Sequence, residues 1–321
     1  MLQKLNAFLE SKMPFITPIS VLLGVTFASY VDSFSFLVPW LFAFMTFSGS
    51  LGSNIKSFKE VMIHPLPIII TMCILHVIMP LWAFGVGHIV FHGDVYTITG
   101  LTLGMIIPTG ITSVLWVSIY RGNIPLTLAV ILIDTFLSPF IVPYTMSLMV
   151  GEQVEMDILG MMGGLLWMVV LPSLAGMLLN QVTKGKVKTV LGPRLSPISK
   201  IFLGIVVLLN SSVIAPYLRN IDTKLVFIAI VVFFISFSGY LFSFLIGRLL
   251  KMDREDVVSL TFLGGMRNIS TGAVIAISYF PAQVAVPVVI GMLFQQVLAS
   301  SYGRFVDQYY KKRIEVTTKS A

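Results

Sequence analysis

Apolar runs of about twenty residues recur along the whole chain, and they constrain the fold more than any other feature. A helix needs about 20 apolar residues to cross a hydrocarbon core of about 30 Å. The composition agrees, because 56% of the 321 residues are apolar and only 11% are charged. The stretches between the runs are too short to hold a soluble domain. We therefore predict an all-α membrane protein.

Run lengths predict ten transmembrane spans, separated by turn-forming or charged stretches such as HGD, RGN and KMDRED. The expected spans are about 14–31, 34–51, 65–91, 95–120, 124–150, 156–181, 197–217, 224–250, 255–280 and 282–306. They divide into five and five at the acidic stretch GEQVEMD. Because five is an odd number, a second half that resembles the first enters the membrane from the opposite side. This predicts two inverted five-helix repeats, an architecture of secondary transporters.

The Lys and Arg residues fall almost entirely on one side of the predicted spans. Of the 21 in the chain, eighteen lie in one set of loops and tails, only Arg219 and Lys224 lie on the other side, and Arg267 lies within a span. Cytoplasmic loops carry such an excess, so we expect a multi-pass protein of the cytoplasmic membrane with both termini in the cytoplasm. The net charge of +7 then reflects orientation and gives no sign of nucleic-acid binding, although the basic loop 184–194 could also contact anionic lipid.

The fourth span of each predicted half is interrupted. Span four contains LGMIIPTGITS at 103–113, and span nine contains GGMRNISTG at 264–272. Proline and glycine alone are common in membrane helices, but here they occur at matched positions and beside small polar residues. Backbone groups freed at such breaks, and buried away from lipid, can bind a ligand. We therefore expect both helices to be broken and to contribute to a binding site.

Asp134 and Arg267 are an acid and a base placed deep within predicted spans. Each lies 11 residues from the expected cytoplasmic end of its span, at Asn123 and Asp256, which corresponds to a depth of about 16 Å. An isolated charge there costs about 2.5–3.5 kcal/mol. We expect both side chains to face the protein interior and to interact directly or through water, as intramembrane charges on a substrate or ion path do. The alternative is a pair that only locks two helices together.

His76 lies at a comparable depth in span three, 12 residues beyond His64. A neutral imidazole can take up a proton near pH 7, so His76 is a candidate for coupling. The alternative, which the sequence favours, is a packing residue.

Three stretches resemble motifs of the bile acid:sodium symporter family. They are PTGITSVLWVSIYRGNIPLTLAVILIDTFLSP at 108–139, GGMRNISTGAVIA at 264–276 and LHVIMPLWAF at 75–84. The resemblance implies ten helices, of which four and nine unwind and cross. It also implies that sodium binds behind the crossing, that organic anions such as bile acids or pantoate-like acids bind before it, and that alternating access moves one domain against the other. The implied panel domain covers about 14–51 and 156–217, and the implied core domain covers about 65–150 and 224–306.

The chain departs from this family at the sodium sites. Leu263 replaces a glutamate, Arg267 a glutamine, Val114 an asparagine and Leu75 another glutamine, and Ile131 stands at a hydroxyl position. Sodium coupling, expected from the family, is therefore doubtful here. The sodium-site positions that remain are Ser113, Thr127 and Met266.

We hypothesise that Arg267 supplies the positive charge that sodium supplies in the relatives, with Asp134 as its counter-ion. Transport would then be coupled to protons through Asp134 or His76, or would be uncoupled. No cofactor is expected. The resemblance, together with the breaks, points to these substrate-binding residues: Thr109, Gly110, Thr112, Ser113, Arg267, Asn268, Ser270, Thr271 and Gln296. Small polar residues also pack membrane helices together, which is the alternative for each of them.

The predicted function is secondary transport of a small organic anion, with a channel or a non-transporting sensor on the same fold as the alternative. An intramembrane enzyme would need a nucleophile beside a base, or clustered metal ligands. The four histidines are scattered and no such motif occurs, so we do not expect an enzyme. The sequence does not predict the oligomeric state.

Overall fold

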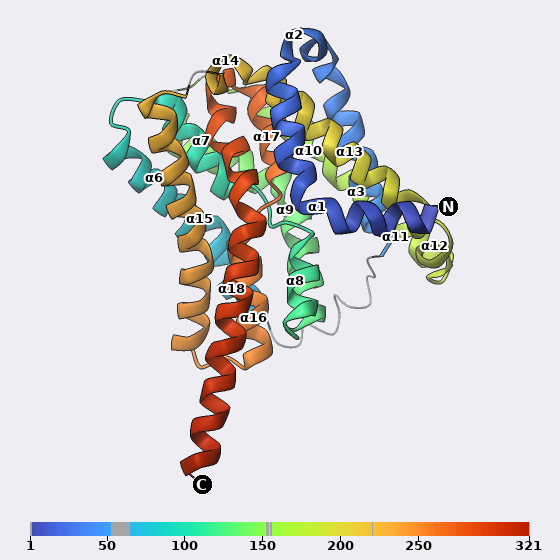
Figure 1. Cartoon of the computed structure of the whole chain (residues 1–321), viewed down its shortest axis with the longest axis vertical. Coiled ribbons are helices and arrows are strands. Elements are labelled where there is room, and N and C mark those ends of the chain that lie inside the picture. Colours follow the sequence, from blue (N-terminus) through green and yellow to red (C-terminus); the bar gives the residue numbers. More distant parts are fainter. Residues whose placement is uncertain (1, 53–64, 152–153, 155, 220, 321) are drawn as a thin grey trace.

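The computed structural model of the chain describes residues 2–52, 65–151, 154, 156–219 and 221–320, and it is helical throughout (Figure 1). Among these residues, β-type backbone pairing occurs at one isolated antiparallel bridge, between Thr109 and Arg267. Residues 53–64 lie between the second and third predicted spans and are outside the described residues. They include Lys56, Lys59 and His64. The prediction of an all-α membrane protein is confirmed at this level.

In the part of the chain that the structure describes, seven helices are long and apolar enough to cross a membrane, and three shorter apolar helices accompany them. The long ones are Ala28–Ser50, Leu66–Val90, Ile124–Val150, Ile158–Val182, Gly192–Val213, Thr223–Leu249 and Ala282–Lys311. The shorter ones are Phe15–Thr26, Val95–Ile106 and Ile269–Tyr279. Each lies mostly within a different predicted span, although Ala28–Ser50 also overlaps the end of the first. The inverted repeat itself stays a prediction.

Short irregular turns interrupt several of these helices. The elements of the first half are α1 (Leu2–Thr26), α2 (Ala28–Val31), η1 (Asp32–Leu37), α3 (Val38–Ser50), α5 (Leu66–Cys73), η2 (Ile74–Ile78), α6 (Met79–Val90), α7 (Val95–Ile106), α8 (Ser113–Ile119) and α9 (Ile124–Val150). Those of the second half are α10 (Ile158–Leu165), η3 (Leu166–Val170), α11 (Leu171–Val182), α12 (Lys186–Val190), α13 (Gly192–Val213), α14 (Ala215–Leu218), α15 (Thr223–Leu249), α16 (Arg254–Gly265), α17 (Ile269–Tyr279), η4 (Ala282–Val284) and α18 (Ala285–Ser320). The turns η2 and η3 are π-helical, whereas η1 and η4 are 3-10 helices.

Acidic and amide side chains start the helices that follow the connecting loops. Asp94, Asn123, Asp157 and Asp222 each accept a hydrogen bond from the backbone N–H three residues later, at 2.7–3.3 Å. The first amides of a helix have no partner within the helix, so such caps stabilise its start. Several residues that separate the spans in the sequence therefore also fix where the next helix begins.

Two groups of helices pack side by side. In one group, α1 lies along α13, and α3 contacts both α13 and α11. A Cβ atom at Gly24 of α1 would overlap the carbonyl of Leu208 in α13, so glycine permits their close approach. In the other group, α15 contacts α16 and α18, while α18 also contacts α7 and α17. In Figure 1, α15 lies on the left, α18 near the middle, and α3, α11 and α13 on the right.

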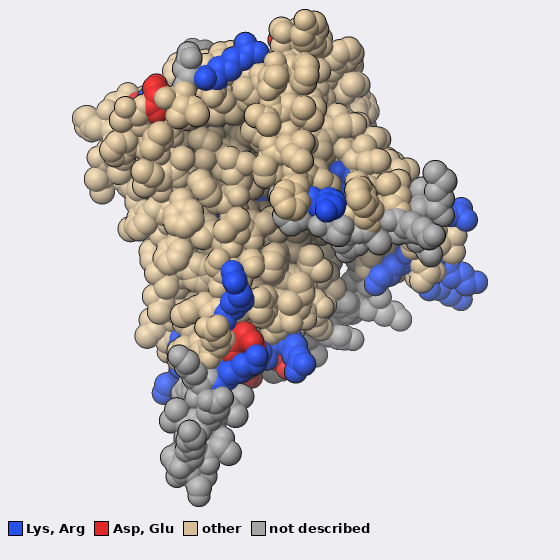
Figure 2. Space-filling view, in the orientation of Figure 1, with Lys and Arg blue, Asp and Glu red and all other residues tan. Residues whose placement is uncertain are grey.

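The surface carries its charges mainly at one end. Figure 2 shows a broad uncharged belt, with Lys and Arg gathered near α12 and around the lower ends of α16 and α18. Among the Asp, Glu, Lys and Arg residues in the described part of the chain, two are buried. They are Asp134, with 0% exposure, and Arg267, with 2%. The expectation that both face the protein interior is met.

Candidate functional site

The helical breaks predicted in spans four and nine lie against each other. The first break runs from 107 to 112, between α7 and α8, and the second from 266 to 268, between α16 and α17. Thr109 and Arg267 form the antiparallel bridge at their contact. Two stretches about 160 residues apart in the sequence thus meet as a short piece of extended backbone.

Each break supplies hydrogen-bond partners for the other. The N–H of Asn268 donates to the carbonyl of Pro108 at 2.8 Å, and the N–H of Gly110 donates to the carbonyl of Met266 at 3.4 Å. Unpaired backbone groups are expensive away from water. This mutual pairing explains how non-helical backbone is tolerated in the interior.

Local sequence explains where the helices stop. Pro108 has no N–H and disfavours helical geometry at Ile107, which adopts φ −55° and ψ 149°. At the end of α16, a Cβ atom on Gly265 would overlap the ring of Tyr240, and one on Gly264 would overlap the hydroxyl of Ser243. Glycine is therefore required where α16 ends against α15.

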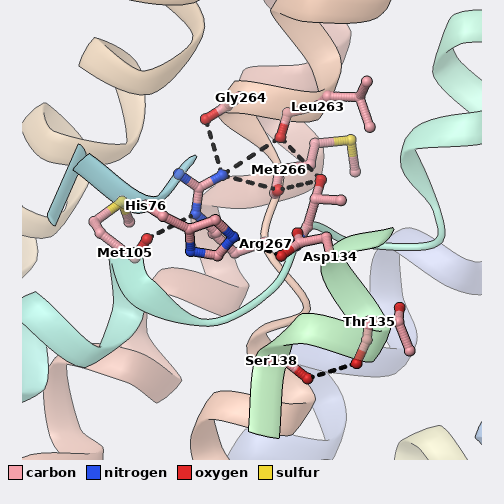
Figure 3. A network of polar contacts seen from close by, with 10 residues as sticks. His76, Met105, Asp134, Thr135, Ser138, Leu263, Gly264, Met266 and Arg267 are labelled. Atoms are coloured by element: carbon pink, nitrogen blue, oxygen red, sulfur yellow. Dashed lines mark hydrogen bonds and ion pairs between the residues drawn. The ribbon is translucent and has the colours of Figure 1, made fainter. Parts of the chain in front are cut away.

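The Arg267 side chain turns back onto the ends of two half-helices (Figure 3). Its Nε donates to the carbonyl of Met105 at 3.2 Å. Its Nη1 donates to the carbonyls of Gly264 at 3.0 Å and of Leu263 and Met266 at 3.4 Å. These carbonyls lie at the C-terminal ends of α7 and α16, where helix dipoles favour a cation. The guanidinium thus binds the negative ends of both interrupted helices.

The backbone of Arg267 is held by a residue that the sequence did not single out. Its N–H donates to Oε1 of Gln295 in α18 at 3.0 Å. The predicted neighbour, Gln296, is exposed and accepts a hydrogen bond from Nε1 of Trp116 at 3.1 Å. Adjacent residues on a helix point about 100° apart, and the motif match alone could not tell which glutamine faces the crossing.

Asp134 binds the other break. Its Oδ2 accepts a hydrogen bond from the N–H of Thr109 at 2.6 Å, and its Oδ1 lies 2.7 Å from Nε2 of His76. Within the described residues, Asp134 and Arg267 form no ion pair, although they lie within electrostatic range of each other. The expected interaction of Asp134 with Arg267 is therefore not a direct ion pair in the described structure, and the role of Asp134 as counter-ion stays a prediction. The nearest partners of the carboxylate are an imidazole and a backbone amide.

His76 contacts this carboxylate, and the choice between a coupling role and a packing role stays a prediction. It lies in the π-helical turn η2, its side chain is 8% exposed, and its Nδ1 is buried without a partner in the described structure. A π turn inserts one extra residue into a helix and often occurs at functional sites. The turn rotates the side chains that follow it relative to an unbroken helix, so hydropathy did not predict where His76 points.

Thr109 connects the two charged groups. Its Oγ1 lies 2.9 Å from the carbonyl oxygen of Leu263 and 3.1 Å from that of Met266, and it donates to them. The same two carbonyls accept from Nη1 of Arg267. One network of contacts therefore runs from His76 through Asp134, Thr109 and the end of α16 to Arg267.

The other predicted binding residues lie around the crossing. Gly110 is buried within the bridge, and Asn268 caps α17 by accepting from the N–H of Thr271 at 3.4 Å. The hydroxyls of Ser113 and Thr271 are buried without a partner in the described structure. Two predicted residues lie further out, namely Thr112, which is exposed, and Ser270, which is half-buried.

The residues at the family's sodium positions do not fit a sodium ion. Leu75, Ile131 and Leu263 are buried in one apolar cluster, and Val114 packs against it. Of the remaining positions, the hydroxyl of Thr127 donates to a carbonyl in its own helix at 2.8 Å. Hard cations need several oxygen ligands, and methyl groups now occupy this region. The structure adds that the substituted side chains contact one another.

Comparisons with known proteins agree with this architecture. The model of the SBF-like CPA transporter family matches residues 26–309. The uncharacterized protein YbaS of Bacillus subtilis (strain 168) is 52% identical over 300 residues, which cover 94% of this chain and 98% of that protein. The uncharacterized sodium-dependent transporter YocS of the same organism is 27% identical over 315 residues, covering 94% and 97%.

A plant relative matches less of the chain. The probable sodium/metabolite cotransporter BASS1 of Arabidopsis thaliana, a chloroplastic protein, is 29% identical over 224 residues, which cover 70% of this chain and 55% of that protein. The resemblance to the bile acid:sodium symporter family is confirmed, and with it the expectation of a transporter that is not an enzyme. The chain belongs to the SBF-like CPA transporter family.

Proposed function

We propose that this protein is a secondary transporter that carries a small organic anion across the cytoplasmic membrane, and that Arg267 takes the place of a sodium ion. One observation carries the proposal. The guanidinium of Arg267, 2% exposed, binds carbonyls at the ends of α7 and α16. A cation at that place is needed to offset two helix C-termini, and here it is part of the chain.

The surroundings support a sodium-independent mechanism. An ion cage needs oxygen ligands with local negative charge, and Leu75, Ile131 and Leu263 form an apolar cluster instead. The names of YocS and BASS1 refer to sodium. We propose that this chain, with Leu263 and Arg267, does not require sodium.

The substrate class follows from the polar groups left over at the crossing. Nη2 of Arg267 and the hydroxyls of Ser113 and Thr271 are buried and unpartnered in the described structure. A guanidinium pairs readily with a carboxylate, and the start of a helix such as α17 favours an anion. We therefore propose a bile-acid-like or pantoate-like carboxylate as substrate, bound by these groups together with Thr109, Gly110, Asn268 and Ser270.

Movement of two domains would carry the substrate across. We propose that the group of α1, α3, α11 and α13 belongs to the panel domain and the group of α7, α15, α16, α17 and α18 to the core domain, which the contacts within each group support. Contacts of α17 with α13 and α3 join them. We propose alternating access by sliding at this contact, with inverted five-helix repeats and both termini in the cytoplasm.

Transport by purified protein in liposomes tests this function. Vesicles loaded with unlabelled pantoate or glycocholate should take up the labelled anion by saturable counterflow, at the same rate in sodium and in choline buffer. Flux that does not saturate would indicate the alternative of a channel, and no flux of either anion would favour a sensor. Uptake that requires sodium would contradict the role proposed for Arg267.

A further inference from the structure

We propose that His76 and Asp134 form the proton site that couples this transporter, and that Nδ1 of His76 receives the proton. The inference rests on the proposed function, because it names the coupling ion of the same site. Its basis is a buried imidazole–carboxylate contact of 2.7 Å at the crossing. Their side chains are 8% and 0% exposed.

The hydrogen bonds indicate which atoms of the pair carry a proton. An ionised carboxylate only accepts, so Asp134 accepts from the N–H of Thr109 through Oδ2 and from His76 through Oδ1. Nε2 of His76 must then carry the ring proton, which leaves a free lone pair on Nδ1. That atom is buried and has no partner among the described residues. The ring therefore has one vacant place for a proton, and histidine is the side chain that ordinarily titrates between pH 5 and 8.

Charge balance links this proton to the substrate. Arg267 and Asp134 carry opposite charges within electrostatic range of each other, so with neutral His76 the crossing has no net charge. A monocarboxylate brings one negative charge into this interior, and an uncompensated charge is expensive there. One proton taken up from water by Nδ1 offsets it, and the same proton leaves to water on the other side. The stoichiometry is one proton for each carboxylate, without net charge movement.

The pair is also connected by hydrogen bonds to the two helix breaks. Asp134 accepts a hydrogen bond from the N–H of Thr109, and the hydroxyl of Thr109 donates to the carbonyls of Leu263 and Met266. Protonation of the pair weakens the negative charge that the Thr109 amide faces. Occupancy by a proton is thereby transmitted to the contact between the two breaks.

Other titratable groups near the pair are few. Arg267 comes from the break before α17, and Tyr240 of α15 lies within electrostatic range of Arg267. The elements that pack around η2 contribute, in their described parts, Cys73 from α5, His88 from α6, Tyr96 from α7, and Arg254, Glu255 and Asp256 at the far end of α16. His88 bonds the carbonyl of Phe84 in its own helix at 3.0 Å. It therefore provides a matched control histidine.

Nitrogen NMR of histidine tests the site without any substrate. The chain has 4 histidines, and the His76→Gln variant identifies the signal of His76. In wild-type protein in lipid nanodiscs, followed over the pH range in which the protein stays folded, Nδ1 should change from an unprotonated to a protonated nitrogen as the pH falls, with Nε2 protonated at both ends. In Asp134→Asn this transition should move or vanish. A His76 signal that keeps one form across that range would overturn the proposal.

Transport under imposed gradients provides the second test. With one proton per anion, a pH gradient of one unit sustains about tenfold accumulation of labelled pantoate or glycocholate, and an imposed membrane potential should add nothing. His76→Gln should lose the accumulation while counterflow remains measurable, and His88→Gln should keep both. Counterflow in wild-type vesicles without any response to the pH gradient would overturn proton coupling and leave the carrier function standing. Absence of counterflow would contradict the carrier function instead, and the NMR titration would then decide on the proton site alone.

Discussion

Nε of Arg267 lies 3.2 Å from the carbonyl oxygen of Met105, so a side chain from one interrupted span binds the end of the other. The same guanidinium binds the end of its own half-helix through Gly264 at 3.0 Å. One residue therefore ties together two helix termini that come from different halves of the chain. The stability of the crossing should depend on this cation more than on any apolar contact near it.

Replacing Arg267 by methionine should destabilise the protein strongly. The carbonyls of Met105 and Gly264 would lose the guanidinium as donor, at about 1–3 kcal/mol for each group left unsatisfied, whereas those of Leu263 and Met266 would keep the hydroxyl of Thr109. Arg267→Lys should be intermediate, since an ammonium cannot reproduce the planar fork. Thermal unfolding in detergent measures both. Arg219→Met is the control, because exposed Arg219 also bonds a carbonyl, that of Val25; a similar loss in both variants would argue against a special role for Arg267.

The two buried charges should be energetically coupled although they do not touch. Asp134→Asn and Arg267→Gln each leave one buried charge without compensation, whereas the double variant removes both. We expect the double variant to be more stable than the sum of the single effects predicts, by about 0.5–3 kcal/mol. The free energies of unfolding of the wild type, the two single variants and the double variant, measured at one pH, give this coupling energy. Additive effects would show that the network through Thr109 carries no coupling.

Restoring an acid and removing the guanidinium should restore a sodium effect. In Leu263→Glu/Arg267→Gln, sodium should raise the unfolding temperature relative to choline, with a stabilisation of about 2.7 kcal/mol at a concentration one hundred times its Kd. Wild-type protein and Arg267→Gln alone should respond equally to both salts. A sodium response of the wild type would count against the replacement of the ion.

Acid should weaken the start of α7. Burial raises the pKa of Asp94, but hydrogen bonds from Lys224 and Thr97 outweigh it and hold that pKa below its ordinary value. The stabilisation is therefore present above the unfolded pKa, about 3.9, and is lost as the pH falls through the lower folded value. Because the side chain of Asp94 is 24% exposed, the effect should stay below about 1 kcal/mol. Asn is also a good cap, so Asp94→Asn should keep the helix and lose this part of the pH dependence of unfolding below about pH 4.

Glycine at 265 should not tolerate even one methyl group. Gly265→Ala would push a Cβ into the ring of Tyr240, and such overpacking costs about 1–3 kcal/mol. Gly104→Ala is the matched control, since nothing lies within 4 Å of the place that its methyl group would take. That variant should be neutral or slightly more stable in thermal unfolding. Equal tolerance at both positions would contradict the close contact of α16 with α15.

Hydropathy and glycine or proline positions were enough to place the apolar helices and both interruptions. They work because the bilayer fixes helix length and because Pro108 cannot continue a helix with full hydrogen bonding. Counting residues also put Asp134 and Arg267 at one depth. The count gives depth alone, however, and leaves open which way each side chain points around its helix.

Direction around the helix is what the sequence could not supply. The pairing of His76 with Asp134 depends on the π turn Ile74–Ile78, which changes the phase of the helix without a clear signal in the residues. The hydrogen bond from the N–H of Arg267 to Gln295 went unpredicted for the same reason. By contrast, comparison with the family motif was enough to predict that apolar side chains stand at 75, 131 and 263 in place of oxygen ligands. Only the packing of these side chains against one another required the structure.

A charge that is covalently attached to the backbone has full occupancy in any medium. A freely diffusing ion fills its site only in proportion to its concentration, so a crossing built on such an ion loosens in dilute salt. The guanidinium of Arg267 removes that dependence, and the junction of the broken helices is assembled from the moment the chain folds. Its integrity is then independent of the ionic gradients that the surrounding cell maintains.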